Sequence, residues 1–96
     1  MRSLKYNKAS DSYVKTVQKA TGTKPALREV TLAHGDTALP HGLVEKYGHR
    51  QLYHTYLFSP GHAADLNHIH LVGTSISLQE AIADVRRAWE KIGDTT

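Results

Sequence analysis

The sequence predicts an α+β domain in the order αβββα, with an antiparallel sheet of three to four strands and both helices packed on one face. Two observations predict this class: helical spacing of apolar residues occurs near both ends of the chain, and strand-like segments separated by Gly and Pro lie between them. The length of 96 residues allows a single domain over residues 1–96. Within it, residues 1–9 form a basic N-terminal arm and residues 94–96 a frayed tail.

The first helix is expected over residues 11–21. Ser10 is a suitable N-cap, and Asp11 places a negative charge at the positive end of the helix dipole. Gly22 suits the left-handed residue that commonly follows the last turn of a helix.

Three strands are expected, over residues 26–33, 50–58 and 66–72. The second is rich in aromatic and β-branched residues, which favour strands. Turn residues separate the three segments. A further strand is left open, either in the basic arm or in residues 43–47, which are also compatible with a helical turn or an irregular crossing.

The second helix is expected over residues 78–92 and carries the clearest signals in the chain. Ser77 and Glu80 fit the capping-box pattern of a helix start. An apolar stripe that includes Val85 and Trp89 gives the helix one face to bury against the sheet.

The positive charge is confined to the N-terminal quarter of the chain. The overall net charge is +3, with all seven histidines counted as neutral. Residues 1–24 hold six basic side chains and one acidic one, whereas the rest of the chain is slightly acidic. Such a basic segment, with Tyr6 and Tyr13 placed to stack on bases, is typical of nucleic-acid binding. The candidate nucleic-acid contacts are Lys5, Lys8, Lys15 and Lys19.

A histidine pair is the sharpest candidate site. His68 and His70 are two residues apart, so on a strand they would share one face and could hold a divalent metal ion. His54 on the neighbouring predicted strand is a candidate third ligand. His62 and Asp65, in the intervening loop, are further candidates.

The same histidines allow a reaction without metal. His54 paired with His68 or His70 would provide a general base and a general acid at a phosphodiester. Arg50 or Lys46 would then stabilise the developing negative charge. In both schemes His54, His68 and His70 are the candidate catalytic residues.

The segment Asn67–Val72 and the basic helix after it resemble the His-hydrophobic-His region of single-strand DNA transposases and replication-initiator nucleases. The resemblance covers about 25–40 residues. It implies a ferredoxin-like sandwich, a metal ion held by His68 and His70, and a tyrosine that attacks the DNA phosphate. This sequence departs from that pattern because the helix after His70 carries Trp89 and no tyrosine. Tyr13 on the first helix would serve only in a permuted arrangement.

Composition excludes several classes of function. The chain has no cysteine, which rules out disulfides and thiolate metal sites and fits a cytoplasmic location. No apolar run is long enough for a membrane span, and no signal peptide is expected. No glycine-rich phosphate loop is present, so no nucleotide cofactor is expected.

Two functions follow from this sequence. The first is a small nucleic-acid-binding protein, in its strongest form a histidine-dependent nuclease-like domain of a mobile-element, phage or regulatory system. The alternative is a non-catalytic protein-interaction module, such as a small phage- or plasmid-encoded inhibitor or adaptor of a larger machine. Pairing of edge strands would also allow such a module to form a homodimer.

Overall fold

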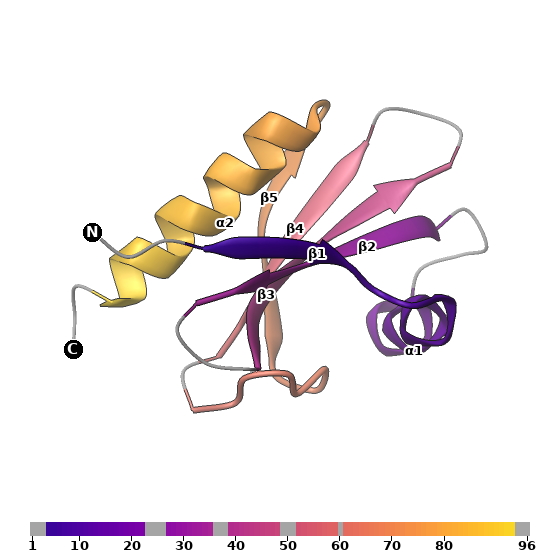
Figure 1. The fold of residues 1–96 in the computed structure, drawn as a ribbon, viewed down its shortest axis with the longest axis horizontal. Helices are drawn as coiled ribbons and strands as arrows, with labels where there is room; N and C mark the ends of the chain where they lie inside the picture. The colour runs from indigo at the N-terminus through magenta and orange to yellow at the C-terminus, as the bar shows by residue number, and fades with distance from the viewer. Residues whose placement is uncertain (1–3, 23–26, 36–38, 49–51, 60, 94–96) are drawn as a thin grey trace.

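The computed structural model describes residues 4–22, 27–35, 39–48, 52–59 and 61–93. They form a five-stranded antiparallel sheet and two helices (Figure 1). The strands lie in the order β1-β2-β3-β4-β5, so each pairs only with its neighbours along the chain. The elements are β1 (Lys5–Lys8), α1 (Asp11–Thr21), β2 (Leu27–His34), β3 (Pro40–Tyr47), β4 (Tyr53–Phe58), β5 (Ile69–Ser75) and α2 (Leu78–Gly93).

The α+β class is confirmed, but the expected three to four strands are five, because both of the segments left open are strands. Within the basic arm, β1 pairs with β2, with Lys5 opposite His34. The second addition, β3, lies at the centre of the sheet between β2 and β4. Its residues Gly42 to Glu45 are all buried, so it lacks the alternation of buried and exposed positions that marks a one-sided strand.

The boundaries of β5 differ from the prediction. The strand was expected over residues 66–72, but it starts at Ile69 and continues through Gly73 to Ser75. Gly73 lies inside the strand, at a position where a Cβ atom would come within 2.5 Å of the Asp84 carboxylate on α2. The missing side chain lets the helix approach the sheet closely.

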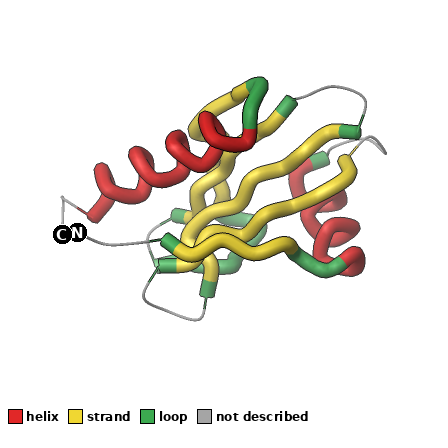
Figure 2. Tube along the Cα trace, turned by 45° about the horizontal axis from the view of Figure 1, so that its top comes forward, coloured by secondary structure: helices red, strands yellow, loops and turns green. Residues whose placement is uncertain are grey.

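The two helices pack on opposite faces of the sheet, so the expectation that both cover one face is wrong. Val30 of β2 packs with Val17 of α1, whereas Ala33 of the same strand packs with Trp89 of α2. Residues three apart on a regular strand point to opposite faces. Figures 1 and 2 show α2 along one side of the sheet and α1 on the other. The predicted ferredoxin-like arrangement is therefore not formed.

Leu66 anchors the segment between β4 and β5, which contains several of the candidate site residues. Leu66, in the segment between β4 and β5, packs against the hydrophobic cluster beneath α1. The buried members of that cluster are Val17, Leu27, Val30, Leu43 and Phe58. This contact holds the segment on the α1 side of the sheet.

The helix boundaries depend on local capping. The helix α1 has the predicted bounds, and α2 starts as predicted and ends one residue later, at Gly93. The Tyr13 N–H donates to Ser10 Oγ at 3.3 Å, and Gly22 adopts a φ of +70° after the last turn of α1. At the start of α2, the Glu80 N–H donates to Ser77 Oγ at 3.2 Å. Within the described ranges, neither helix is long and apolar enough to span a membrane. The predicted tail at residues 94–96 lies outside the described residues.

Candidate functional site

Residues 61–68, which we call the histidine loop, form a series of tight turns between β4 and β5. Gly61 and Ala64 both have positive φ angles, of 80° and 66°. Positive φ is uncommon for a residue with a side chain such as Ala64. The Asp65 N–H donates to the His62 carbonyl at 3.0 Å, and the His68 N–H donates to the Asp65 carbonyl at 2.9 Å. These turns bring three side chains that are distributed over seven residues onto one side of the loop.

The side chains of His62, Asp65 and His68 lie close together and form one cluster. Asp65 Oδ2 lies 2.9 Å from His68 Nδ1 and 3.8 Å from His62 Nδ1. The two imidazole rings are stacked, with centroids 3.9 Å apart and an interplanar angle of 8°. One ligand atom from each side chain lies within 4.8 Å of the other two. The cluster therefore brings together two nitrogen donors and one oxygen donor.

Hydrogen bonds fix the Asp65 carboxylate. Its Oδ1 atom accepts the Asn67 N–H at 3.0 Å, which leaves Oδ2 directed at the histidines. The Asn67 N–H is the main cause of a lowered pKa for Asp65, with further contributions from His68 and His62. The carboxylate is therefore ionised and is held in a defined orientation.

The structure does not bring together the three predicted catalytic histidines. His68 lies in the turn before β5, so it does not share a strand face with His70 as expected. In the sheet, His70 is opposite Leu57 and His54 is opposite Thr74. Because Leu57 and His54 are three residues apart on β4, they and their cross-strand partners point to opposite faces.

His70 and His54 each have a different partner. His70 Nε2 lies 2.6 Å from Ser59 Oγ, and His54 Nδ1 lies 3.2 Å from the Tyr47 hydroxyl. Lys46 pairs with Tyr53 and so lies on the opposite face from His54. Arg50, the other candidate for stabilising negative charge, lies outside the described residues. No pair of imidazoles suited to acid–base catalysis is therefore formed among His54, His68 and His70.

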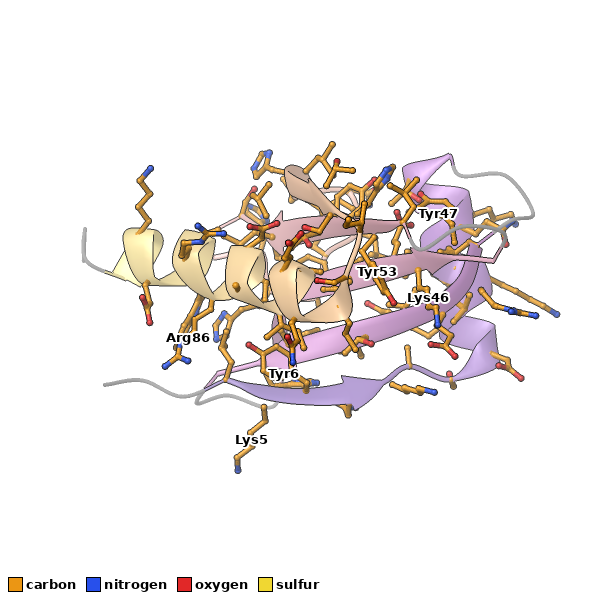
Figure 3. The ribbon with its side chains drawn as sticks, turned by 90° about the horizontal axis from the view of Figure 1, so that it is seen from above. Lys5, Tyr6, Lys46, Tyr47, Tyr53 and Arg86 are labelled. Atoms are coloured by element: carbon orange, nitrogen blue, oxygen red, sulfur yellow. The ribbon has the colours of Figure 1, made fainter. Side chains whose placement is uncertain are left out.

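The four candidate lysines lie on β1 and α1. Lys15 and Lys19 are exposed one turn apart on α1, and Lys5 is exposed on β1. Figure 3 shows Lys5 pointing away from the sheet at the β1 edge. Lys8 is also exposed, and its Nζ atom lies 3.4 Å from Glu29 Oε1.

The two tyrosines proposed to stack on bases are partly buried in the hydrophobic core. Tyr6 packs with the cluster beneath α2, and Tyr13 with the cluster beneath α1. The Tyr13 hydroxyl is buried and has no hydrogen-bond partner in the described part of the chain. Each ring therefore has only part of its surface available for stacking on a base, and the buried Tyr13 hydroxyl is not positioned to attack a phosphate.

A buried carboxyl network on the α1 side of the sheet is absent from the sequence prediction. Glu45 is completely buried on β3. It accepts hydrogen bonds from Thr21 Oγ1 and from the Tyr47 hydroxyl, both at 3.0 Å, and from Tyr56. Burial raises the pKa of Glu45, and these hydrogen bonds only partly oppose the shift. Burial and the nearby carboxyl raise the pKa of Tyr56 to about 12.

This network links the C-terminal turn of α1 to two central strands. The only signal for it in the sequence is an acidic residue next to the apolar pair Leu43 and Val44. That signal alone does not distinguish a buried carboxyl group from an exposed one.

Comparison with known proteins gives no match, whether with family models, with curated proteins or with solved structures. The geometry and charge of this chain are therefore the basis for its proposed function.

Proposed function

We propose that this protein binds nucleic acid through phosphate contacts made by Lys15 and Lys19 of α1 and by Lys5 of β1. The observation that carries the proposal is the contrast between the two helices. On α2, Arg86 and Arg87 form ion pairs with Glu90 and Asp84. On α1, Lys15 and Lys19 are in no ion pair with any residue of the described ranges.

The surface between Lys15 and Lys19 is suited to a phosphate group. A shallow hollow there is lined by Lys15, Thr16, Gln18 and Lys19, with no carboxylate among them. By contrast, a cavity of about 330 Å³ beside the start of α1 has walls of mixed charge. It is lined by Lys8, Ala9, Asp11, Val14, Arg28, Glu29, Val30 and Lys46. The carboxylates of Asp11 and Glu29 would repel a phosphate at that second position.

Because Tyr6 and Tyr13 are partly buried against the core, the proposed binding is mainly electrostatic. Contacts to phosphate groups carry no base information, so binding should depend weakly on sequence and strongly on salt. The proposal is limited to binding, since no acid–base pair is formed among the predicted histidines.

The double variant Lys15→Gln/Lys19→Gln tests this proposal. We expect roughly tenfold weaker binding at low salt and a slope of log affinity against log salt that is shallower by about two units on duplex DNA. Glutamine has a helix propensity close to that of lysine, so α1 should be preserved. The measurement is fluorescence anisotropy with single-stranded and double-stranded DNA and RNA, with EDTA present.

The matched control is Arg87→Gln/Lys91→Gln. It removes the same charge at the same i,i+4 spacing from α2, on the other side of the sheet, and should change the affinity by less than about twofold. Equal weakening by both double variants would show that only net charge matters and would contradict a site on α1. No binding of any probe at low salt would overturn the proposal.

One observation favours the second candidate function, a homodimeric interaction module. The sheet has β5 at one edge, and residues 69–78 contain no Lys, Arg, Asp or Glu. Four large apolar side chains are exposed along this segment: Leu71, Val72, Ile76 and Leu78. An uncharged edge strand lacks the usual barrier to pairing with another strand. Two antiparallel copies of β5 would pair without placing like charges together.

This candidate predicts a dimer that a charge on the β5 edge disrupts. We expect light scattering after size-exclusion chromatography to give twice the chain mass for the wild type and a single chain mass for Leu71→Lys. Leu39→Lys is the control, because Leu39 has nearly the same exposure, 53 % against 55 %, but lies just before β3. A wild type that stays monomeric at high concentration would rule out the homodimer.

A further inference from the structure

We propose that His62, Asp65 and His68 bind one divalent transition-metal ion in the histidine loop. The geometry carries this inference, because three ligand atoms from three side chains lie within 4.8 Å of one another. The site is independent of the nucleic-acid function proposed above, since none of the lysines in that proposal belongs to it.

The distances are close to those that a metal requires. Ligands about 2.1 Å from a tetrahedral ion are about 3.4 Å from each other. Asp65 Oδ2 lies 2.9 Å from His68 Nδ1 and 3.8 Å from His62 Nδ1, values on either side of that spacing. The imidazole rings are stacked, with both Nδ1 atoms near the same oxygen. Because a ring nitrogen binds a metal in the plane of its ring, one of the two rings must turn out of the stack to complete the coordination. Both side chains are about half exposed, which leaves room for that rotation.

The backbone of the loop holds the three ligand residues close together before any ion binds. Asp65 is fixed by the Asn67 N–H at its Oδ1 atom, and the backbone of Asp65 accepts the His68 N–H. Leu66, between the ligands, packs into the core beneath α1 and anchors the loop to the sheet. Binding would therefore require little ordering of the backbone, which preserves affinity.

The ligand set selects the class of metal. Two imidazole nitrogens and one carboxylate oxygen suit Zn²⁺, Co²⁺ or Ni²⁺ better than Mg²⁺ or Ca²⁺, which prefer oxygen ligands. Three protein ligands leave at least one coordination position for water or an exogenous anion. The site thus has the ligand count of an open zinc centre rather than of a closed structural one.

This site differs from the pair suggested by the sequence, His68 with His70. His70 lies on β5 and contacts Ser59, outside the cluster. Substitution of His70 therefore distinguishes a site formed by His62, Asp65 and His68 from a site formed by His68 and His70. It is also a matched control, because it removes one exposed histidine only two residues from His68.

The experiment is titration of the untagged chain with Zn²⁺ by calorimetry and with Co²⁺ by visible absorption. We expect one ion per chain, and a loss of affinity of at least about tenfold for His62→Ala and for His68→Ala. His70→Ala should stay within about twofold of the wild type. The Co²⁺ bands should disappear with the first two variants and remain with the third.

Two outcomes would overturn the site: no binding of either ion, or a loss with His70→Ala as large as that with His62→Ala. Circular dichroism of each variant checks the fold. If His68→Ala does not fold, Asp65→Asn gives a second test, because asparagine keeps an oxygen for the Asn67 N–H and removes the charge. Asp65→Asn is also expected to weaken Zn²⁺ binding by about tenfold or more.

Discussion

Replacing Glu45 with alanine is expected to lower the free energy of unfolding by about 3 kcal/mol near pH 5. The substitution removes the acceptor for the hydroxyls of Thr21, Tyr47 and Tyr56 and leaves space in the centre of the sheet. Chemical denaturation of the wild type and the variant measures the difference. A change below about 1 kcal/mol would contradict the structural role given to this network.

The cost of Glu45→Ala should shrink as the pH rises toward 8. Burial raises the pKa of Glu45, so the folded state holds its proton more tightly than the unfolded state does. The contribution of Glu45 to stability is therefore largest below its ordinary pKa and falls as the pH rises through the raised value. Alanine does not titrate, so the variant does not lose this stability as the pH rises.

Glu45→Gln serves as the control for that pH dependence. Glutamine fills nearly the same volume and has no proton to lose, so its stability relative to the wild type should improve from pH 4 to pH 8. Both proteins contain the other carboxylates, so the contributions of those groups to the pH dependence of stability cancel. Asp65 is one of them: its pKa is lowered, and its effect on stability has the opposite sign. A constant difference between the two proteins would show that Glu45 titrates normally.

Gly42→Ala is expected to cost about 2–3 kcal/mol of unfolding free energy through a steric conflict in the centre of the sheet. A Cβ atom at this position of β3 would lie 2.6 Å from Val85 Cγ2 and 2.8 Å from the Tyr56 carbonyl oxygen. The carbonyl belongs to the backbone of the neighbouring strand, and Val85 is completely buried on α2. Neither atom can move without disturbing the packing of helix on sheet.

Gly73→Ala is the comparison for this prediction. The three atoms nearest to its Cβ atom would all belong to the Asp84 side chain, which can rotate at the expense of its hydrogen bond to Ser75. We therefore expect a smaller loss than for Gly42→Ala in the same denaturation experiment. The reverse order of the two variants would contradict the argument.

The parts of the fold that depend on local signals could be predicted from the sequence. Ser10, Gly22 and Ser77 mark the helix ends because capping involves residues a few positions apart. The sequence does not identify the central strand β3 as a strand, and the reason is physical. The strand is buried on both faces, so its apolar and polar residues do not alternate. Gly42 suggests a turn when read locally, yet it is needed for close packing with α2.

The choice of sheet face could not be predicted. An apolar stripe shows that a helix buries one side, but it does not show which face of the sheet receives it. The candidate site illustrates a similar limit. The alternation of polar and apolar residues around His68 and His70 suggests that both lie on a strand. In the structure, the turn formed by Asp65 and Asn67 places His68 before the strand and directs its side chain toward His62. The sequence identifies the ligand types, and the loop conformation determines which of them meet.

The nearest-neighbour order of the strands has a consequence for synthesis on the ribosome. Because each strand pairs with the one made just before it, the sheet can assemble progressively as the chain emerges. The helix α2 is made last, and it covers Ala33, Val44 and Leu57. A nascent chain that still lacks α2 presents this apolar face to water or to a chaperone. We therefore expect aggregation during translation to be most severe for chains truncated before residue 78, and to decrease only after α2 has docked.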